Sequence, residues 1–322
     1  MKKGILYALI CAVVMLFQIP EAQAAQQRLS IATGGTAGIY FPIGGAMARA
    51  VSKAGNIQAT AESSNASVAN VNLLSKYEID LVFAQNDVTY WAFNGQNMFE
   101  KPITNLRTVL TLFPEHVHWL VGRDSGIKTL HDMKGKRVNV GAPGSGYEAG
   151  ARATLDAAGM TFDDFRVNRL DAGGSAARFK DGQLDAAIFV IGYPAPAPMD
   201  IATSRPVTLI NFDQAYMDTL VKKYPFFVPS SIPAGTYTGI THDTVTPAVM
   251  ALLVTHDKMS EATIYTFLKN LFDNLPEIHA AHSKAQGITL ENAMSGLAVA
   301  PLHPGAAKFY KERGLTFPAG VK

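Results

Sequence analysis

Apolar runs of strand length alternate with segments of helical periodicity in the first part of the chain. One helix is predicted to begin at Pro42 and to end at Gly55, and a second, capped by Ser64 or Asn65, to run to about Lys76. The strands predicted around these helices cover residues 28–33, 57–63 and 79–85. Repeated strand–helix–strand order favours a mostly parallel sheet with helices on both faces.

A long extended stretch at 106–123 interrupts this order, because two β-rich runs follow each other without a helix between them. Such a stretch suits a crossing between two lobes, and the stretch 246–256 can carry the chain back. Between them the alternation resumes with a strand, a glycine loop and a helix at 136–160. Further strands are predicted at 165–170, 184–190 and 206–210, and further helices at 174–180, 260–273, 276–282 and after Pro304. The predicted fold class is α/β, with two lobes that are each a mostly parallel sheet flanked by helices and that are joined by crossing strands.

We expect residues 1–24 to be a signal peptide that is removed, because two lysines precede an apolar run and an Ala-Gln-Ala cleavage pattern. The apolar run, residues 5–19, is shorter than the roughly 20 residues that a membrane-spanning helix needs. The only cysteine, Cys11, lies in this segment, so disulfides and thiolate metal sites are not expected in the mature protein. The predicted borders are 25–120 for the first part of lobe 1, 121–248 for lobe 2, and 249–322 for the return strand and C-terminal helices, mostly in lobe 1.

The balance of charges does not indicate a nucleic acid or an acidic membrane surface as a partner. The 322 residues carry a formal net charge of +2, and charged residues make up 17% of the chain. We therefore expect a monomeric protein of the periplasm, not itself embedded in the membrane, whose binding is decided by a local site.

A glycine-rich loop with a lone threonine follows the first predicted strand. Gly34, Gly35 and Gly38 allow positive φ and close backbone approach, so several N–H groups around Thr36 can face one small acceptor. The next helix directs its partial positive end at the same place, which favours a carboxylate or phosphate ligand. The alternative is a tight strand-to-helix turn that holds no ligand.

A second glycine loop, GAPGSGYE at 141–148, indicates which kind of anion the protein could bind. Gly141 and Gly146 have the spacing of a phosphate loop, but Tyr147 and Glu148 stand where Lys and Ser or Thr are required. A dinucleotide fingerprint also fails in the first loop, because Thr36 occupies the place of its second glycine. With both nucleotide motifs excluded, the two loops are interpreted as binding a small anion, with one loop on each predicted lobe.

Other polar residues follow the predicted strands at their carboxyl ends, where a doubly wound sheet presents its ligand site. Ser64, Asn65 and Asp87 are each also reasonable helix N-caps, and their common location is what favours a binding role. An acid such as Asp87 among anion-binding loops suits a ligand that carries an ammonium group as well. The residues concerned are Ser63, Ser64 and Asn65 after the second strand, Gln85, Asn86 and Asp87 after the third, and Tyr193 after the stretch 184–190.

Five segments together resemble the TAXI family of solute receptors, which serve TRAP transporters. They occur in the order of that family between about Leu29 and the C-terminal helices, which is far more specific than any single loop. The resemblance implies a two-lobed, type II-like periplasmic binding protein that delivers a small organic acid, often glutamate or a related dicarboxylate or oxo acid, to a permease driven by an ion gradient. The segments are TGGTAGIYFPIGGAMARAV, SSNASVANVNLLSKYEIDLVFAQNDVTYWAFNG, LFPEHVHWLVGRDSGI, VNVGAPGSG and DGQLDAAIFVIGYPAPA.

The resemblance also implies which segments face the cleft between the lobes. A threonine often follows GSG in the family where this chain has Tyr147, and a histidine often precedes the proline where this chain has Tyr193. Two bulkier phenols suit a shorter pocket or a flatter ligand, which weakens the assignment of glutamate. The predicted ligand-binding residues are Gly35, Thr36, Tyr40, Ser64, Asn65, Gln85, Asp87, Ser145, Gly146, Tyr147 and Tyr193.

No enzyme activity, cofactor or metal site is predicted. His116 and His118 share one face of a predicted strand and could form half of a metal site, but no cysteine or third ligand is near in the sequence. Ser145 lacks the G-x-S-x-G elbow of hydrolases, and no nucleophile, base and orienting residue can be grouped. A transport receptor is therefore favoured over two alternatives, a periplasmic sensor adaptor for a histidine kinase and a periplasmic hydrolase or lyase.

Overall fold

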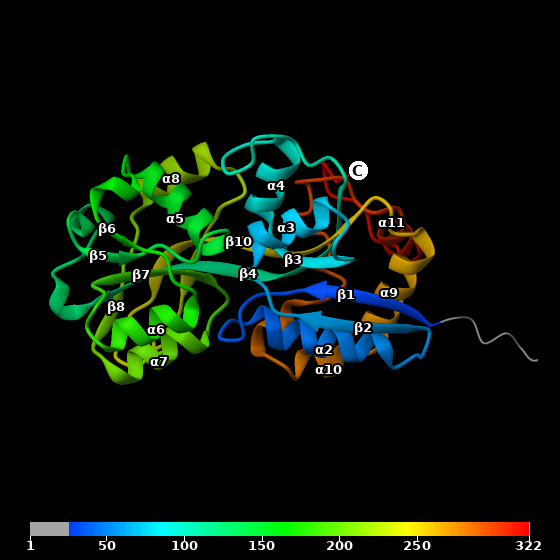
Figure 1. Ribbon diagram of the computed structural model, residues 1–322, viewed down its shortest axis with the longest axis horizontal. Helices are drawn as coiled ribbons and strands as arrows, with labels where there is room; N and C mark the ends of the chain where they lie inside the picture. The colour runs from blue at the N-terminus through cyan, green and yellow to red at the C-terminus, as the bar shows by residue number, and fades with distance from the viewer. Residues whose placement is uncertain (1–25, 322) are drawn as a thin grey trace, which may run out of the picture.

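The computed structural model describes residues 26–321, so the predicted signal peptide at 1–24 lies outside the described residues. Figure 1 shows two lobes, each built of strands with helices packed around them. Lobe 1, on the right in this view, holds the blue-to-cyan and the orange-to-red segments, and lobe 2, on the left, holds the green middle of the chain. Between residues 26 and 321 no helix is long and apolar enough to span a membrane.

Lobe 1 begins with the strand and helix repeat that the hydrophobic pattern predicts. Its first elements are β1 (Gln27–Ala32), α2 (Tyr40–Ser52), β2 (Ile57–Glu62), α3 (Ser67–Ser75), β3 (Leu81–Gln85) and α4 (Asn86–Asn94). β1 lies between β2 and β3 and pairs with both in parallel. The apolar stripe of α2, which includes Ile43, Met47 and Val51, is buried against this sheet.

Lobe 2 repeats the arrangement with shorter strands. Its elements are β5 (Arg137–Asn139), α5 (Gly146–Ala157), β6 (Arg166–Asn168), α6 (Ala172–Lys180), β7 (Ala186–Ile191), α7 (Pro196–Ser204), β8 (Val207–Leu209), α8 (Gln214–Lys223) and β9 (Val228–Ile232). β5 lies between β6 and β7 and pairs with both in parallel. The side chains of β7 are buried on both faces, as expected of a central parallel strand covered by helices on both sides.

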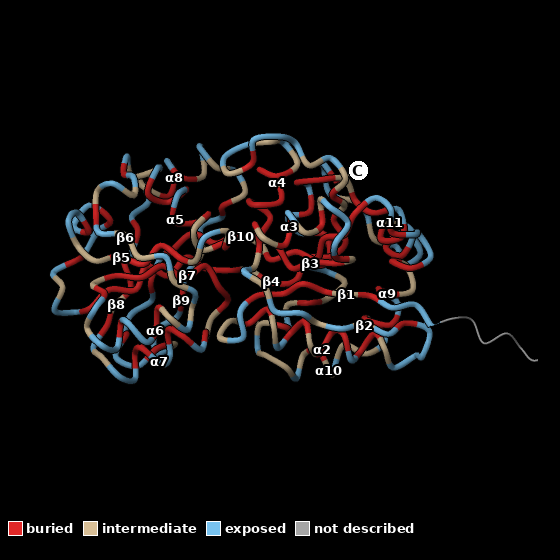
Figure 2. Tube along the Cα trace, viewed as in Figure 1, coloured by how far each residue is buried: buried red, intermediate tan, exposed pale blue. Residues whose placement is uncertain are grey.

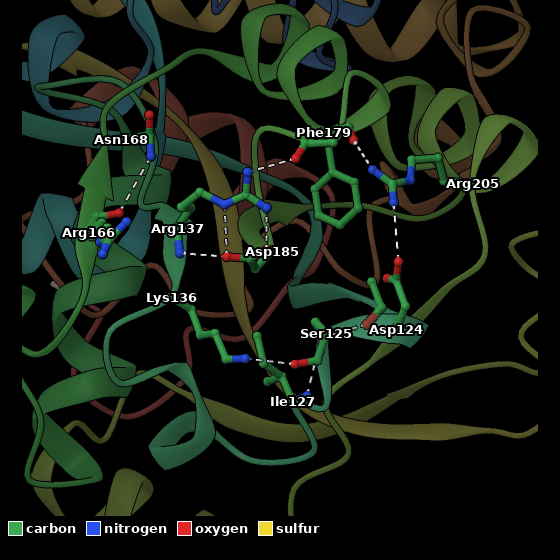
Figure 3. A network of polar contacts seen from close by, with 12 residues as sticks. Asp124, Ser125, Ile127, Lys136, Arg137, Arg166, Asn168, Phe179, Asp185 and Arg205 are labelled. Atoms are coloured by element: carbon green, nitrogen blue, oxygen red, sulfur yellow. Dashed lines mark hydrogen bonds and ion pairs between the residues drawn. The ribbon is translucent and has the colours of Figure 1, made fainter.

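A polar network at the outer end of lobe 2 holds the short strand β5 in place (Figure 3). The Arg137 guanidinium donates to both carboxylate oxygens of Asp185, over 3.1 and 2.6 Å, and to the backbone carbonyl of Gly182. The Arg137 backbone N–H also donates to Asp185, over 2.8 Å. Because Asp185 directly precedes β7, this bidentate pair adds side-chain bonds to the few backbone bonds that three residues can make.

Two long strands, β4 (Leu106–Gly122) and β10 (Thr244–His256), connect the lobes. They pair antiparallel along lobe 1, and at His116 β4 has two partners, Ala248 of β10 on one edge and Ile191 of β7 on the other. The strand order is therefore continuous through both lobes, β2-β1-β3-β10-β4-β7-β5-β6, with β8 on β4 and β9 on β10. The predicted fold class, two α/β lobes joined by crossing strands, is confirmed.

The C-terminal segment returns to lobe 1. α9 (Glu261–Asp273) begins after Ser260, whose hydroxyl accepts from the Thr263 N–H as predicted for a cap, and α10 (Leu275–His279) and α11 (Pro304–Glu312) follow. The Asn270 amide of α9 donates to a carbonyl of α2 over 2.9 Å, and the Tyr310 hydroxyl of α11 donates to one of β4 over 2.7 Å. Figure 2 shows that the central strands of both lobes are buried while the loops at the outer ends are exposed.

Four elements were not predicted from the pattern: α4, α7, α8 and β9. α4 follows β3 with no loop, because the last residue of the strand, Gln85, is also the N-cap of the helix. α7 begins at Pro196, a residue that suits the first helical turn but that stands in a proline-rich stretch typical of a loop.

The contact between α11 and α9 predicts a sensitive glycine. A Cβ at Gly305 would lie 2.3 Å from the backbone carbonyl oxygen of Glu261, so Gly305→Ala is expected to lower the free energy of unfolding by about 1–3 kcal/mol through overpacking. Urea denaturation measures this change. Gly45→Ala in α2 is the control, since its Cβ would meet nothing closer than 3.6 Å and should leave stability equal or higher. Equal stability of the two variants would show that α9 and α11 can move apart freely.

Candidate ligand-binding site

A cavity of about 260 Å³ lies between the lobes, at the loops that follow their parallel strands. This is the edge where a doubly wound sheet presents its ligand site. Both glycine loops reach it, the first from lobe 1 and the second from lobe 2. The wall consists of residues 34–40, 64–67, Gln85 and Glu115 from lobe 1, and of Ala142, 145–147, 171–174 and 190–191 from lobe 2.

Four helices of the described chain begin at this wall. Tyr40 is the first residue of α2 and Ser67 of α3 in lobe 1, while Gly146 begins α5 and Ala172 begins α6 in lobe 2. A helix N-terminus has N–H groups without a partner in its own helix and carries about half a positive charge. Since the wall, as far as the chain is described, has no Lys or Arg, backbone dipoles are its only source of positive potential.

A buried carboxyl group forms the inner part of the wall. Glu115, on β4, is 2% exposed, and the Tyr40 hydroxyl donates to its Oε2 over 2.6 Å. Burial raises the pKa of Glu115 to about 8, while the hydrogen bond from Tyr40 acts in the opposite direction. The carboxyl group of Asp87 is close enough to raise the pKa of Glu115 further. The carboxyl group of Glu115 therefore keeps its proton to a higher pH than a glutamate in water does.

Asp87 lies behind this wall. It is fully buried in the first turn of α4, and neither of its carboxylate oxygens has a hydrogen-bond partner within residues 26–321. Burial raises the pKa of Asp87 to about 7. Glu115 and Asp87 are called the carboxyl pair below.

The lobes touch each other across the cavity. The side-chain amide of Gln85 packs on Gly146, where a Cβ would lie 2.2 Å from the Gln85 Oε1. Nearby, the Ala69 N–H in α3 donates to the Gly144 carbonyl of the second glycine loop over 3.0 Å. The structure is therefore that of a closed arrangement of the lobes.

Of the eleven predicted binding residues, the structure brings nine together on the cavity wall. Gly35 and Thr36 are exposed on it, and Ser145 accepts from the Glu148 N–H as the cap of α5. Ser64 and Asn65 are not caps of α3, as the sequence had allowed, because the N-cap is Ala66. The Ser64 hydroxyl instead bonds Thr33 and Asn70. The nine residues are Gly35, Thr36, Tyr40, Ser64, Asn65, Gln85, Ser145, Gly146 and Tyr147.

The other two, Asp87 and Tyr193, do not belong to the wall. Asp87 lies below it, as described, and is not the cap of α4, because that position is Gln85. The Tyr193 ring packs on His116 with 4.5 Å between ring centroids and lies 3.4 Å from the Lys284 Nζ. Tyr193 thus covers the crossing strands beside the cavity.

Sequence reasoning missed two parts of the wall, Glu115 and the start of α6. Glu115 lies in a stretch predicted as a strand, and no local signal shows that its carboxyl meets Tyr40 from a distant helix. The start of α6 did carry a signal, because Asp171 is followed by Ala-Gly-Gly and its side chain accepts from the Gly174 N–H as an N-cap.

The histidines considered for metal binding have structural partners. His116 Nε2 bonds the Ser230 hydroxyl at 2.9 Å, and His118 bonds the Tyr237 hydroxyl and a backbone carbonyl, both at 2.8 Å. These bonds join β4 to β9 and to the loop after it. Within the described part of the chain, no group of three or more His, Cys, Asp or Glu side chains could hold a metal ion.

Two solved structures support this description of the fold, and a third matches more of the chain with a lower TM-score. A candidate L-cystine ABC transporter protein from Listeria monocytogenes is 12% identical, with a TM-score of 0.51 over 81% of this chain and 96% of that protein. A binding-protein component of an ABC phosphonate transporter from Pseudomonas aeruginosa is 12% identical, with a TM-score of 0.50 over 81% and 80%. An alkanesulfonate-binding protein from Xanthomonas axonopodis pv. citri is 18% identical over 92% and 97%, with a TM-score of 0.49.

The match to a sequence family is more extensive. The model of the NMT1-like family matches residues 31–314, which include both lobes, both glycine loops and the crossing strands. The chain therefore belongs to the NMT1-like family, a family of periplasmic solute-binding proteins.

Proposed function

We propose that this protein is a receptor that captures a small organic acid, glutamate or a related dicarboxylate or oxo acid, and delivers it to a membrane transporter. The observation that carries the proposal is the convergence of four helix N-termini from both lobes on one cavity without a basic side chain on its described wall. A cavity of about 260 Å³ suits a metabolite rather than a polymer. A carboxylate supplies the oxygen acceptors that such N–H groups need.

The energies are sufficient for capture. Micromolar affinity corresponds to about −8 kcal/mol. Hydrogen bonds to a charged group contribute roughly 1.5–3 kcal/mol each before the ordering costs are subtracted, so several N–H and hydroxyl donors are enough. Arginine is not needed. Arg152 and Arg169, which lie close in sequence to wall residues of lobe 2, both pair with Glu148.

Closure of the lobes is the proposed signal to the transporter. Contacts made only in the closed arrangement favour that arrangement once the ligand joins the two walls. Besides the contacts at Gly144 and Gly146, Phe226 of lobe 2 packs on Tyr90 and Trp91 of α4, with ring centroids 5.5 and 5.1 Å apart. β4 and β10 are the connections about which the lobes would turn, in keeping with the proposed borders 25–120, 121–248 and 249–322.

A TRAP-type permease is the proposed membrane partner, on the basis of the five segments that resemble the TAXI family. The proteins of Listeria and Pseudomonas with a similar fold are named for ABC transporters, so an ABC-type membrane component is the second candidate. Either partner places the mature receptor in the periplasm, in keeping with the signal peptide proposed at 1–24. Co-purification with membrane subunits of one type would decide between them.

Screening the purified protein by thermal shift tests the proposed ligand class. L-glutamate, 2-oxoglutarate and succinate are compared with an alkanesulfonate, a phosphonate and L-cystine, which the related structures suggest. We expect one of the three carboxylic acids to raise the melting temperature most, because binding only to the native state stabilises it by mass action. The ligand should be recovered unchanged. Stabilisation only by a sulfonate, phosphonate or cystine would contradict the assigned class, and a new product would contradict a receptor role.

Thr36 tests the first glycine loop. Its side chain is exposed on the wall, so Thr36→Val should remove one hydroxyl partner of the ligand and weaken binding by about 1–2 kcal/mol with the fold intact. Titration calorimetry measures the change. Thr60→Val on the exposed face of β2 is the matched control and should bind like the wild type. Unchanged affinity of Thr36→Val would remove Thr36 from the site.

Gly146 tests closure. The added methyl of Gly146→Ala meets Gln85 of the other lobe, so overpacking of about 1–3 kcal/mol falls on the closed arrangement and should weaken binding roughly 5- to 150-fold. Gly150→Ala in the same helix is the contrast, because its Cβ would lie 2.6 Å from Val190 of its own lobe. That variant should lower the melting temperature of the free protein, whereas Gly146→Ala should leave it nearly unchanged. The opposite result would exclude Gly146 as a closure contact.

A further inference from the structure

The cavity wall contains two acids with different surroundings. Asp171 is exposed and caps α6 through its bond to Gly174. Glu115 is buried, and one of its carboxyl oxygens is engaged by the Tyr40 hydroxyl. An ionised Glu115 would weaken the binding of an anion at the four helix N-termini. The carboxylate of Glu115 and the bound anion would then be two like charges in one closed space.

The carboxyl pair has no positive partner to keep it ionised. No ion pair of the described chain includes Glu115 or Asp87, and both oxygens of Asp87 lack hydrogen-bond partners there. Two carboxylates in one dry region cannot both be ionised without a large desolvation cost. The pair therefore retains a proton in the closed structure.

The other groups around Glu115 do not change this balance. The titratable groups that face it are Tyr40 from α2, Asp87 from α4 and Tyr147 from α5, and all three are neutral or negative. β10 places Val249 opposite Glu115, and the adjacent His116 on β4 is bonded to Ser230. The ammonium group of Lys284 lies over the Tyr193 ring, and its charge lowers the pKa of His116. The groups that shift the pKa of Glu115 do not include Lys284.

We propose that Glu115 is a specificity-determining residue of the cavity, which remains protonated in the loaded receptor and donates a hydrogen bond to an anionic oxygen of the ligand, so that the anion binds together with one proton. The inference rests on the proposed function, since it requires an anionic ligand. Glu115 then acts as a neutral donor where many anion sites use arginine or lysine.

A pH dependence with a definite sign follows. Burial raises the pKa of Glu115 to about 8, and a bound anion would raise it further. Below this value Glu115 already holds the proton that the loaded state needs. Above the pKa that Glu115 has in the free receptor the proton must be taken up on binding, so the affinity for an acid falls as the pH rises, by up to about tenfold per pH unit.

Titration calorimetry at pH 7 and pH 9 tests the inference, with whichever of L-glutamate, 2-oxoglutarate and succinate the wild type binds most tightly. Glu115→Gln keeps the shape and offers a neutral N–H donor. It should bind within about threefold of the wild type at pH 7 and lose the part of the pH dependence that Glu115 causes. Glu78→Gln, at an exposed position outside the cavity wall, is the matched control and should follow the wild-type profile.

Two results would overturn the inference. The first is a loss of more than about tenfold at pH 7 in Glu115→Gln, which would mean that an ionised Glu115 holds a positive group of the ligand. The second is a wild-type affinity that stays level or rises from pH 7 to pH 9. If none of the three acids binds the wild type, the proposed function fails and the inference with it, whereas binding without the expected profile defeats the inference alone.

Tyr40→Phe provides an independent variant should Glu115→Gln not fold. The Tyr40 hydroxyl stabilises the ionised form of Glu115, so its removal should raise the pKa of Glu115 and move the alkaline loss of affinity to higher pH. A loss at the same or lower pH than in the wild type would contradict protonation of Glu115 as its cause.

Discussion

The antiparallel pairing of β4 with β10 is the constraint on which the rest of the structure depends. These strands are the only part of the described sheet that continues from one lobe into the other, and β4 begins to pair with β7 of lobe 2 at His116, where its pairing with β10 ends. A shift of one residue in this pairing would turn every side chain to the opposite face. Glu115 would then point away from Tyr40, and the cavity would lose its inner wall.

The proposed capture of an anion would depend on backbone groups alone. The first residues of α2, α3, α5 and α6 face one space, and their dipoles replace the side-chain cations that are absent from the described wall. Because these dipoles belong to both lobes, the full potential exists only when the lobes are together. Capture and closure are thus parts of one interaction.

Strand and helix order could be predicted because it is encoded locally. Ser260 before an amphipathic segment was enough to place α9, and the glycine loops marked the ends of two buried strands. α4 was missed because it begins without a loop, and Glu115 because its partner Tyr40 lies 75 positions away. Such pairings depend on the assembled sheet. Nine predicted residues lie on one cavity wall because the ends of parallel strands meet at one edge of a sheet, whereas Asp87 and Tyr193 lie behind and beside that wall.

The packing of Trp91 against Phe226 has a practical consequence. The chain has two tryptophans, and the other, Trp119, is fully buried within β4, where it donates to Thr154 of lobe 2. Trp91 therefore lies at a contact that the proposed opening of the lobes would expose to water. If the lobes open as proposed, the emission of Trp91 is an intrinsic optical reporter of that motion, readable by stopped flow without any dye.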